Sequence, residues 1–263
     1  MSPDGHELPR RVLITGAAGA IGSCLRHGLR PLVDELVLTD VRAIEAEANE
    51  RFVRADLADR DAIGRAAEDV DAVVHLGAMP TEAPFGDLLA PNFIGTFNVF
   101  DAARLGGARR IVFASSNHAT GFYPVEQTLA GHEPTRPDSL YGVTKVYGEA
   151  LGRLFVDKFD MEVVCLRIGT FAERPRQTRD LATWLSPADA VRLFAASLSA
   201  PDVGFRVVYG ASANTRRFWD LTSGRALGYE PQDDAERYAD DVVGTPHRFQ
   251  GGSFTARDAG GWA

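Results

Sequence analysis

Short apolar segments rich in β-branched residues alternate with helix-like segments along most of the chain. The helix-like segments lie at about residues 20–30, 59–68, 86–105, 139–159 and 187–199. The last one begins with Ser186-Pro187, a helix-capping residue followed by proline at the first helical position. Such alternation predicts the strands of a parallel sheet joined by helices. The expected strands are Arg11–Thr15, Glu35–Thr39, Arg51–Ala55, Ala72–Leu76, Arg110–Ala114, Glu162–Arg167 and Phe205–Tyr209.

This pattern predicts an α/β fold with a doubly wound, Rossmann-like parallel sheet and a small C-terminal part. Ligands of such sheets bind beyond the carboxyl ends of the strands. Two long connections, residues 115–137 and 168–185, follow strands at that edge, and long ordered connections of this kind are usually functional. The chain has 263 residues and neither an internal repeat nor a low-complexity linker, so we expect one domain over residues 1–263.

Composition excludes several classes of protein. Hydrophobic residues make up 45% and charged residues 24% of the chain, which is globular usage and not that of a disordered or fibrous protein. The net charge of −8 and the lack of a Lys/Arg-rich run argue against a nucleic-acid partner. No apolar stretch approaches the ~18 residues of a membrane span, and the N-terminus lacks the apolar run of a secretory signal, so we expect a cytoplasmic protein without membrane contact. Cys24 and Cys165 alone exclude a disulfide framework, and the six scattered histidines predict no metal site.

The first expected strand leads directly into a glycine-rich loop, Thr15-Gly16-Ala17-Ala18-Gly19-Ala20-Ile21-Gly22, and then into a helix. The three glycines allow a tight turn, close approach of backbone N–H groups to a pyrophosphate, and close packing of the helix on the strand. Asp40 ends the second strand near the ~20-residue offset expected for a carboxylate that binds a ribose diol. The pattern predicts a dinucleotide site that favours NAD over NADP, although Arg42 offers a charge that a 2′-phosphate could use.

Two further strand ends are expected at the adenosine half of the dinucleotide. Asp56-Leu57 after the third strand is placed to meet the adenine ring, and Leu76-Gly77-Ala78 after the fourth lets the chain pass close to the adenosine ribose. His75 ends the fourth strand between apolar residues. For this histidine, a buried core position with satisfied hydrogen bonds is favoured over a catalytic role.

Catalytic candidates gather on the fifth strand and the helix that follows it. The strand ends in four polar residues, Ser115-Ser116-Asn117-His118, and the helix begins Leu140-Tyr141-Gly142-Val143-Thr144-Lys145. Tyr141 and Lys145 are one helical turn apart and therefore share a face. Of the 28 basic residues only Lys145 and Lys158 are lysines, which indicates that a compact ammonium is needed beside the tyrosine. The pair therefore predicts that Tyr141 is a catalytic residue that accepts or donates a proton.

The glycine pattern, the Ser115-Ser116 strand end and Tyr141-x-x-x-Lys145 together resemble the short-chain dehydrogenase/reductase superfamily, with the glycine spacing of its extended, sugar-handling branch. Within that branch the chain is similar over almost its whole length to the uronate dehydrogenase family. The Ser-Ser-Asn-His block and the Gln-Gly-Gly tail are specific to that group, whereas the Tyr/Lys pair is shared by the superfamily. The segments that carry this similarity are Ala114–His118, Tyr141–Lys145, Arg167–Gly169, Tyr209–Asn214 and Arg248–Phe254.

The resemblance implies that NAD oxidises a hexuronic acid, such as glucuronate or galacturonate, at C1 to an aldarolactone. Tyr141 would take the proton of the C1 hydroxyl while Ser116 binds the same oxygen. A tyrosine pKa of ~10 must then fall by ~3 units, and we expect Lys145 and a cationic nicotinamide to supply that shift. Lys145 should also hold the nicotinamide ribose.

The resemblance also implies a set of binding residues, a substrate contribution from about residues 168–263, and a homo-oligomer. The aromatic residues Trp219, Phe249, Phe254 and Trp262 are compatible with an oligomer interface, or with packing on their own chain. The expected cofactor-binding residues are Gly16, Gly19, Ala20, Ile21, Gly22, Asp40, Asp56, Leu57, Leu76, Gly77, Ala78, Tyr141, Lys145 and Ile168. The expected substrate-binding residues are Ser116, Asn117, His118, Thr170 and Arg179.

A uronate carries a carboxylate, and a buried carboxylate requires a cation. Arg174, Arg176 and Arg179 follow the sixth strand closely, at the edge where the substrate must lie. An arginine fork holds a carboxylate through two parallel hydrogen bonds. The resemblance favours Arg179, whereas Arg174 and Arg176 flank Pro175 and are expected to face water.

Two positions differ from the family's pattern, and two other functions share its motifs. Pro80 stands where a serine near the sugar is expected, and Thr170 replaces a serine but keeps a hydroxyl. A nucleotide-sugar epimerase or dehydratase shares the fold and the Tyr/Lys pair, but it needs a larger C-terminal lobe than the fewer than eighty residues after position 185. An NAD-sensing regulator without turnover is less favoured, because such proteins commonly lose the tyrosine.

Overall fold

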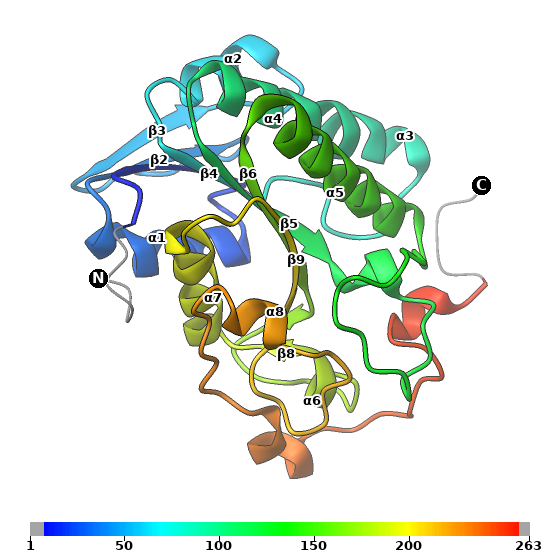
Figure 1. Cartoon of the computed structure of the whole chain (residues 1–263). Helices are drawn as coiled ribbons and strands as arrows, with labels where there is room; N and C mark the ends of the chain where they lie inside the picture. Colours follow the sequence, from blue (N-terminus) through cyan, green and yellow to red (C-terminus); the bar gives the residue numbers. More distant parts are fainter. Residues whose placement is uncertain (1–7, 258–263) are drawn as a thin grey trace.

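The computed structural model describes residues 8–257, and a seven-stranded, all-parallel sheet forms its centre (Figure 1). The strands are ordered β3-β2-β1-β4-β5-β6-β9, so the direction of winding reverses between β1 and β4. This order and the parallel pairing confirm the predicted doubly wound sheet. The strands are β1 Arg11–Thr15, β2 Glu35–Asp40, β3 Glu50–Arg54, β4 Ala72–His75, β5 Arg110–Ser116, β6 Glu162–Ile168 and β9 Phe205–Gly210.

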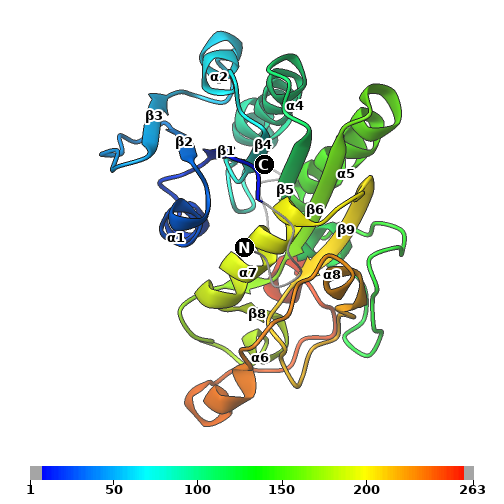
Figure 2. The same ribbon diagram turned by 60° about the vertical axis from the view of Figure 1, so that its left-hand side comes forward.

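Helices cover both faces of the sheet (Figures 1 and 2). α1 and α7 pack together on one face, while α2, α4 and α5 pack on the other. Because neighbouring residues of a strand point to opposite faces, β1 contributes Val12 and Ile14 to the first apolar core and Leu13 to the second. Two cores therefore hold the sheet between helix layers. These helices are α1 Ala20–Leu29, α2 Arg60–Ala66, α4 Gly95–Leu105, α5 Leu140–Phe159 and α7 Pro187–Ser199.

The single helix predicted over residues 86–105 is divided into three parts. α3 (Phe85–Leu88) leads into a π-helical turn, η2 (Leu89–Ile94), and α4 follows. Pro91 lies in this turn, and its missing N–H interrupts the regular ladder of hydrogen bonds. The Gly95 N–H accordingly donates to the carbonyl of Ala90, five residues earlier.

The C-terminal part packs at the carboxyl edge of the large sheet, below it in Figure 1. Its tail runs beside the connection after β5, where the Gln250 N–H donates to the Tyr123 carbonyl and the Gly251 N–H to the Gly121 carbonyl, each at 2.9 Å. The elements of this part are too short to show a hydrophobic period, and the sequence did not predict them. The short elements of the chain are η1 Arg30–Leu32, η3 Asn117–Thr120, β7 Thr170–Phe171, α6 Asp180–Thr183, β8 Trp184–Leu185, α8 Thr222–Arg225, η4 Ala235–Asp241 and η5 Gly252–Thr255.

The aromatic residues considered for an interface pack on their own chain where the structure describes them. Trp219 is 1% exposed and stacks on Tyr209, with ring centres 4.9 Å apart. Phe249 packs edge-on against Phe122, and Phe254 stacks on His118. Trp262 lies outside the described residues.

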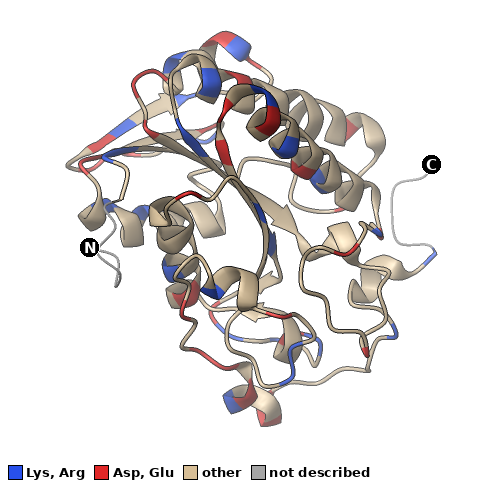
Figure 3. Ribbon diagram, in the orientation of Figure 1, with Lys and Arg blue, Asp and Glu red and all other residues tan. Residues whose placement is uncertain are grey.

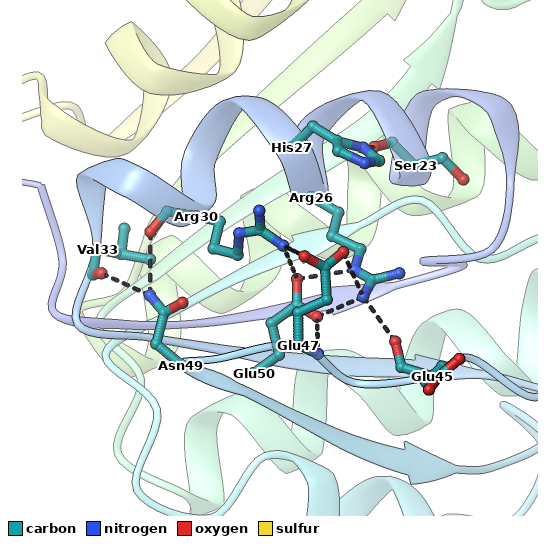
Figure 4. Close-up of polar contacts among 9 residues, drawn as sticks. All are labelled: Ser23, Arg26, His27, Arg30, Val33, Glu45, Glu47, Asn49 and Glu50. Atoms are coloured by element: carbon teal, nitrogen blue, oxygen red, sulfur yellow. Dashed lines mark hydrogen bonds and ion pairs between the residues drawn. The ribbon is translucent and has the colours of Figure 1, made fainter.

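Residues 41–49 join β2 to β3 without a helix and run back along α1 (Figure 4). Arg26 on α1 donates to both oxygens of the Glu50 carboxylate, from Nε at 2.7 Å and from Nη2 at 2.5 Å. The same Nη2 donates to the Glu45 carbonyl at 2.7 Å. These contacts hold the segment that follows Asp40 against α1.

Charged side chains of both signs are spread over the helices and loops (Figure 3). Within residues 8–257, no helix combines the length and the apolar character that a membrane crossing requires. In the same part of the chain, no group of three or more His, Cys, Asp or Glu side chains is arranged to hold a metal ion.

Candidate active site

A cavity of about 760 Å³ lies at the carboxyl ends of β1, β2, β3, β4, β5 and β6. Every residue predicted to bind the cofactor or the substrate lines this cavity except Thr170 and Arg179. Ligands of doubly wound sheets bind at this edge, where the strand order reverses. The sequence did not single out several other lining residues, which are Thr39, Val41, Ala55, Met79, Ala90, Pro91 and Phe171.

The glycine loop forms one wall of the cavity, at the N-terminus of α1. Gly16 has a φ of +68°, and a Cβ atom there would lie 2.7 Å from the Gly77 amide nitrogen. A Cβ atom on Gly22 would lie 2.3 Å from the Gly16 carbonyl oxygen. Gly19 caps α1 without a side-chain hydrogen bond, so the first N–H groups of the helix stay available to an anion. The loop therefore has the shape and polarity that a pyrophosphate requires.

Asp40 lies at the end of β2 and faces the same cavity. Its Oδ2 accepts the Ala18 N–H at 3.0 Å, and its Oδ1 accepts the Arg42 N–H at 2.9 Å. The Arg42 Nε lies 3.7 Å from Oδ1, and the same side chain donates from Nη2 to the Ala18 carbonyl. The positive charge of Arg42 is therefore already paired with Asp40.

His75 lies in the core beneath the cavity. It is 2% exposed, with Nδ1 2.7 Å from Thr15 Oγ1 and Nε2 3.3 Å from Thr96 Oγ1. Burial, assisted by the charge of Lys145, lowers the pKa of His75 to about 3, so the ring is neutral near pH 7. This is the buried, hydrogen-bonded histidine expected from the sequence.

Tyr141 and Lys145 lie on one face of α5, directed at the cavity. Ser139 caps this helix by accepting the Gly142 N–H at 3.0 Å, which fixes its first turn. The Lys145 Nζ donates to the Ala114 carbonyl at 2.9 Å and lies 5.4 Å from the centre of the Tyr141 ring. The last residues of β5 and the first turns of α5 thus hold the pair together.

Burial controls how these two groups ionise. It raises the pKa of Tyr141 to about 12, although the neighbouring Ser116 hydroxyl acts to lower it, and it lowers the pKa of Lys145 to about 8. We expected Lys145 and a bound, cationic nicotinamide together to bring the pKa of Tyr141 towards neutral. Burial raises that pKa because it disfavours the phenolate, and the negative charge of Asp138 raises it further. A positive charge brought into the cavity would act in the opposite direction.

Ser116, Asn117 and His118 line the cavity beside Tyr141. The Ser116 Oγ accepts the His118 N–H at 3.2 Å. In the amide orientation that satisfies both of its neighbours, Asn117 donates to the Ile168 carbonyl at 3.1 Å and accepts from the Arg179 Nη2 at 2.7 Å. Asn117 therefore joins β5 and β6 to the connection that carries Arg179.

Arg179 contacts Asn117, which lines the cavity, but is not itself among the lining residues. Its Nε donates to the Gln250 carbonyl at 2.8 Å, and its Nη1 donates to Thr170 Oγ1 at 3.5 Å. With the bond to Asn117, these contacts use three of the five guanidinium donors and leave one on each terminal nitrogen. Burial lowers the pKa of Arg179 below its usual value. Arg174 and Arg176 are exposed to solvent, as expected.

Comparison with known proteins supplies the family. The model of the NAD dependent epimerase/dehydratase family matches residues 12–204 of the chain. The chain belongs to this family. Its glycine loop, its parallel sheet up to β6, and its Tyr141/Lys145 pair all lie within the matched range.

Relatives within the NAD dependent epimerase/dehydratase family cover nearly the whole chain. Uronate dehydrogenase from Agrobacterium fabrum is 43% identical and covers 93% of this chain and 96% of its own. Among solved structures, glucuronic acid dehydrogenase from Chromohalobacter salexigens is 42% identical, with a TM-score of 0.91 over 94% of this chain and 97% of its own. A mutant uronate dehydrogenase from Agrobacterium tumefaciens, complexed with NAD, is 41% identical, with a TM-score of 0.90 over 95% of this chain and 98% of its own. The resemblance to uronate dehydrogenases is confirmed.

In this family member Glu82 ties the loop after β4 to the catalytic helix. Its carboxylate accepts the N–H groups of Leu140 and Tyr141, at 3.1 and 2.8 Å. Pro80, which replaces the expected serine, lies in the same loop and lines the cavity. Sequence reasoning missed Glu82, because no motif marks a carboxylate that reaches a helix 58 residues later.

Asn92, in the π-helical turn, supports the same loop from the other side. Its Oδ1 accepts the Met79 N–H at 2.7 Å, and its Nδ2 donates to Thr144 Oγ1 at 3.0 Å. At 2% exposure, its amide forms a buried link between the loop and α5. The break in the predicted helix thus occurs where Asn92 contacts Thr144, whose hydroxyl donates to the Tyr141 carbonyl.

A buried ion pair joins α5 to β6. Glu149, one turn beyond Lys145 on α5, accepts from Arg167 at 2.9 and 2.8 Å. The Ser115 hydroxyl also donates to Glu149, at 2.6 Å. Ser115 therefore joins β5 to α5, whereas Ser116 lies beside Tyr141.

Proposed function

We propose that this protein is an NAD-dependent dehydrogenase that oxidises a hexuronic acid at C1 to the aldarolactone. The observation that carries the proposal is one cavity that combines the glycine loop at one end with Tyr141, Lys145 and Ser116 at the other. A dinucleotide and a sugar can meet there, within reach of a residue that moves a proton. The similarity to uronate dehydrogenases over most of the chain points to the substrate class.

The cavity fits NAD by the chemistry of its walls. The glycine loop leaves backbone donors and no side chain where a pyrophosphate would lie. Asp40 can accept from a ribose diol, and its carboxylate pairs with Arg42 and would repel a 2′-phosphate. When bound, NAD would supply the hydride acceptor and a positively charged nicotinamide ring.

Tyr141 is the group that would take the C1 hydroxyl proton of the substrate. Ser116 lies beside it and would hold the same oxygen during the transfer. Burial raises the pKa of the phenol, and a cation that shares the cavity would lower it and favour the phenolate. Lys145, held by the Ala114 carbonyl, would stabilise the phenolate and donate to the nicotinamide ribose.

Arg179 would hold the carboxylate of the uronate, together with Asn117, His118 and Thr170 around the sugar. Its two remaining N–H donors stand on separate terminal nitrogens, which suits a carboxylate that accepts two parallel hydrogen bonds. Contacts to Asn117 and Gln250 orient the guanidinium before substrate arrives. The charge on the substrate would thereby select uronates over neutral hexoses.

The test mixes the purified protein with NAD and follows absorbance of NADH. We expect turnover with glucuronate or galacturonate, little with glucose, and none with UDP-sugars. Tyr141→Phe should fold and bind NAD but lose at least ~10²-fold in turnover, the lower range for a positioned acid or base. Conversion of a UDP-sugar without net NADH, or near-normal turnover by the folded Tyr141→Phe variant, would contradict the proposal.

We also propose that residues 1–263 form one NAD-binding domain, to which about residues 168–263 contribute substrate contacts. The bonds of Arg179 to Asn117 and Gln250 support this arrangement.

A cytoplasmic location is proposed because both cysteines are free thiols.

A homo-oligomer is proposed from a stripe of exposed apolar side chains on neighbouring helices. The side chains on α3, η2 and α4 lie next to those on α5, because these elements contact one another. Soluble monomers rarely leave such a stripe uncovered. Its members are Phe85, Leu89, Ile94, Phe97, Val143 and Leu154, between 41% and 53% exposed.

A further inference from the structure

Asp138 is a buried carboxylate for which the proposed chemistry has no direct use. Its side chain is 0% exposed, and it accepts at both oxygens. Oδ1 accepts the Ser139 hydroxyl at 2.8 Å, and Oδ2 lies 2.8 Å from the His118 Nδ1. Burying a charged carboxylate costs free energy, which its hydrogen bonds must offset. A carboxylate in such a position therefore calls for a structural or functional reason.

Two glycines make room for this carboxylate. A Cβ atom on Gly121 would lie 1.7 Å from Asp138 Oδ2, and one on Gly251 would lie 1.8 Å from it. Gly121 belongs to the connection after β5, and Gly251 to the C-terminal tail. Both segments therefore pack directly on the atom that contacts His118, which gives the Gln-Gly-Gly tail a structural reason.

The His118 ring is held on three sides. Asp138 binds its Nδ1, Phe254 stacks on its face at 4.0 Å between ring centres with an angle of 26°, and Tyr141 meets its edge at 6.0 Å. Within residues 8–257 the Nε2 atom makes no hydrogen bond, and the residue lines the cavity. The free nitrogen is thus the one available to a ligand.

We propose that Asp138 is a positioning residue, which holds His118 in the tautomer that presents Nε2 to a substrate hydroxyl as a hydrogen-bond acceptor. An ionised carboxylate only accepts, so the proton of the neutral ring must lie on Nδ1. The role of the hydroxyl rests on the proposed function, whereas the tautomer does not. His118 would then discriminate among sugars by the position of one hydroxyl.

Asp138→Asn tests this role because Ser139 restricts how the new amide can turn. The Ser139 Oγ already accepts the Gly142 N–H, so its own proton needs the amide oxygen. The amide NH₂ must then face His118 Nδ1, which forces the ring proton onto Nε2 and turns the acceptor into a donor. A similar amide substitution beside a catalytic histidine is known to trap the wrong tautomer.

The first measurement is the tautomer itself, read from long-range ¹H–¹⁵N spectra of the full chain labelled with ¹⁵N-histidine. The chain has six histidines, and His118→Gln identifies the signal of interest. We expect the Nδ1–H form in the wild-type protein and the Nε2–H form in Asp138→Asn. An Nε2–H form in the wild-type protein overturns the proposal, even if the variant does not fold.

The second measurement is a double-mutant cycle on kcat/KM for the uronate. Asp138→Asn should lower it by about tenfold, the range of one lost hydrogen bond, with the Kd for NAD unchanged. In a His118→Ala background the same substitution should have less than about a twofold effect. An equal penalty in both backgrounds would mean that Asp138 acts by a route other than His118, such as its charge beside Tyr141, and the proposal would fail.

Asp189→Asn is the matched control. Asp189 is also a buried carboxylate, on α7, and it accepts the N–H groups of Gln232 and Asp233. Its substitution should lower stability but leave kcat/KM of the folded protein unchanged. If the tautomer switches in Asp138→Asn as expected but the wild-type protein turns over no uronate, the proposed function is wrong. The positioning role of Asp138 then stands.

Discussion

Lys145 carries its charge in a buried position, where its ammonium donates to the Ala114 carbonyl and lies over the rings of Phe113 and Tyr141. Burial lowers its pKa to about 8, from 10.5 for an exposed lysine. Folding therefore proceeds against the cost of desolvating this charge. The buried position of this ammonium therefore reduces the stability of the fold.

Lys145→Met should raise stability near neutral pH. The pKa difference corresponds to about 3 kcal/mol, and the lost hydrogen bond removes about 1 kcal/mol of that gain. Because the folded pKa is below the unfolded one, the cost is complete below pH 8 and disappears as pH rises towards 10.5. Urea unfolding should therefore show a more stable variant at pH 7 and a smaller gap at pH 10. A less stable variant at pH 7 would contradict this reasoning.

Arg179→Ala should lower kcat/KM for a uronate by roughly thirtyfold or more, which corresponds to the ~2 kcal/mol lower bound for an unpaired, partly desolvated carboxylate. NAD binding should be unchanged. Arg176→Ala is the matched control, because this arginine lies three residues away and is exposed. Steady-state kinetics on both variants decide the role. If the loss follows Arg176 instead, the connection is right and the residue is wrong.

At the scale of elements, the segment over residues 41–49 shows how the cofactor end of the cavity is held without a helix. Arg26 on α1 binds the carboxylate of Glu50 and the carbonyl of Glu45 (Figure 4). Burial acts to raise the pKa of Glu50, but the hydrogen bonds from Arg26 and from the Glu47 N–H outweigh it and lower that pKa. The segment carries Arg42, so its position matters for the ribose site.

Arg26→Ala should cost about 1–2 kcal/mol of unfolding free energy. This is less than the ~3–5 kcal/mol of a fully buried pair, because solvent screens part of the interaction. Since the pKa of Glu50 is lowered, the stabilisation is present above its unfolded value and is lost as pH falls through the folded one. Denaturant curves at pH 7 and pH 3.5 test both statements. Arg10→Ala, which removes an exposed pair with Asp34, should leave the midpoint nearly unchanged.

At the scale of the whole molecule, two layers of helices cover the faces of one sheet, and the C-terminal part packs at its carboxyl edge (Figure 2). The cavity draws on the carboxyl ends of six strands and on the connections that follow them. The outer face of α3, η2, α4 and α5 keeps the stripe of exposed apolar side chains described above. That face is the surface proposed to join copies of the chain.

Phe97→Glu should therefore shift the protein towards a monomer. A charge placed among apolar side chains at an interface stays desolvated and unpaired, which weakens association. Light scattering coupled to size-exclusion chromatography gives the molar mass directly. Val243→Glu is the control, since Val243 is 81% exposed and lies outside the stripe. A wild-type protein that is already a monomer would refute the proposed oligomer.

The sequence by itself determined the sheet, its main helices and the placement of Tyr141 and Lys145 on one helix. Apolar period and capping residues are local signals, so β1 and α7 match their predictions in full. The glycine loop and the Tyr141/Lys145 spacing also lie within single elements and their neighbours. The π-helical turn at Pro91 was not predicted, because the hydrophobic period is judged over many residues and does not show a break of one turn.

Only the tertiary structure decided how the site is supported. Gln250 reaches Arg179 across 71 residues, and Glu82 reaches Tyr141 across 59. No local pattern encodes such contacts, because they depend on where two distant segments pack. Burial is likewise a property of the whole fold, which is why the pKa of Tyr141 rises in the chain alone although its sequence neighbour on the helix is a lysine.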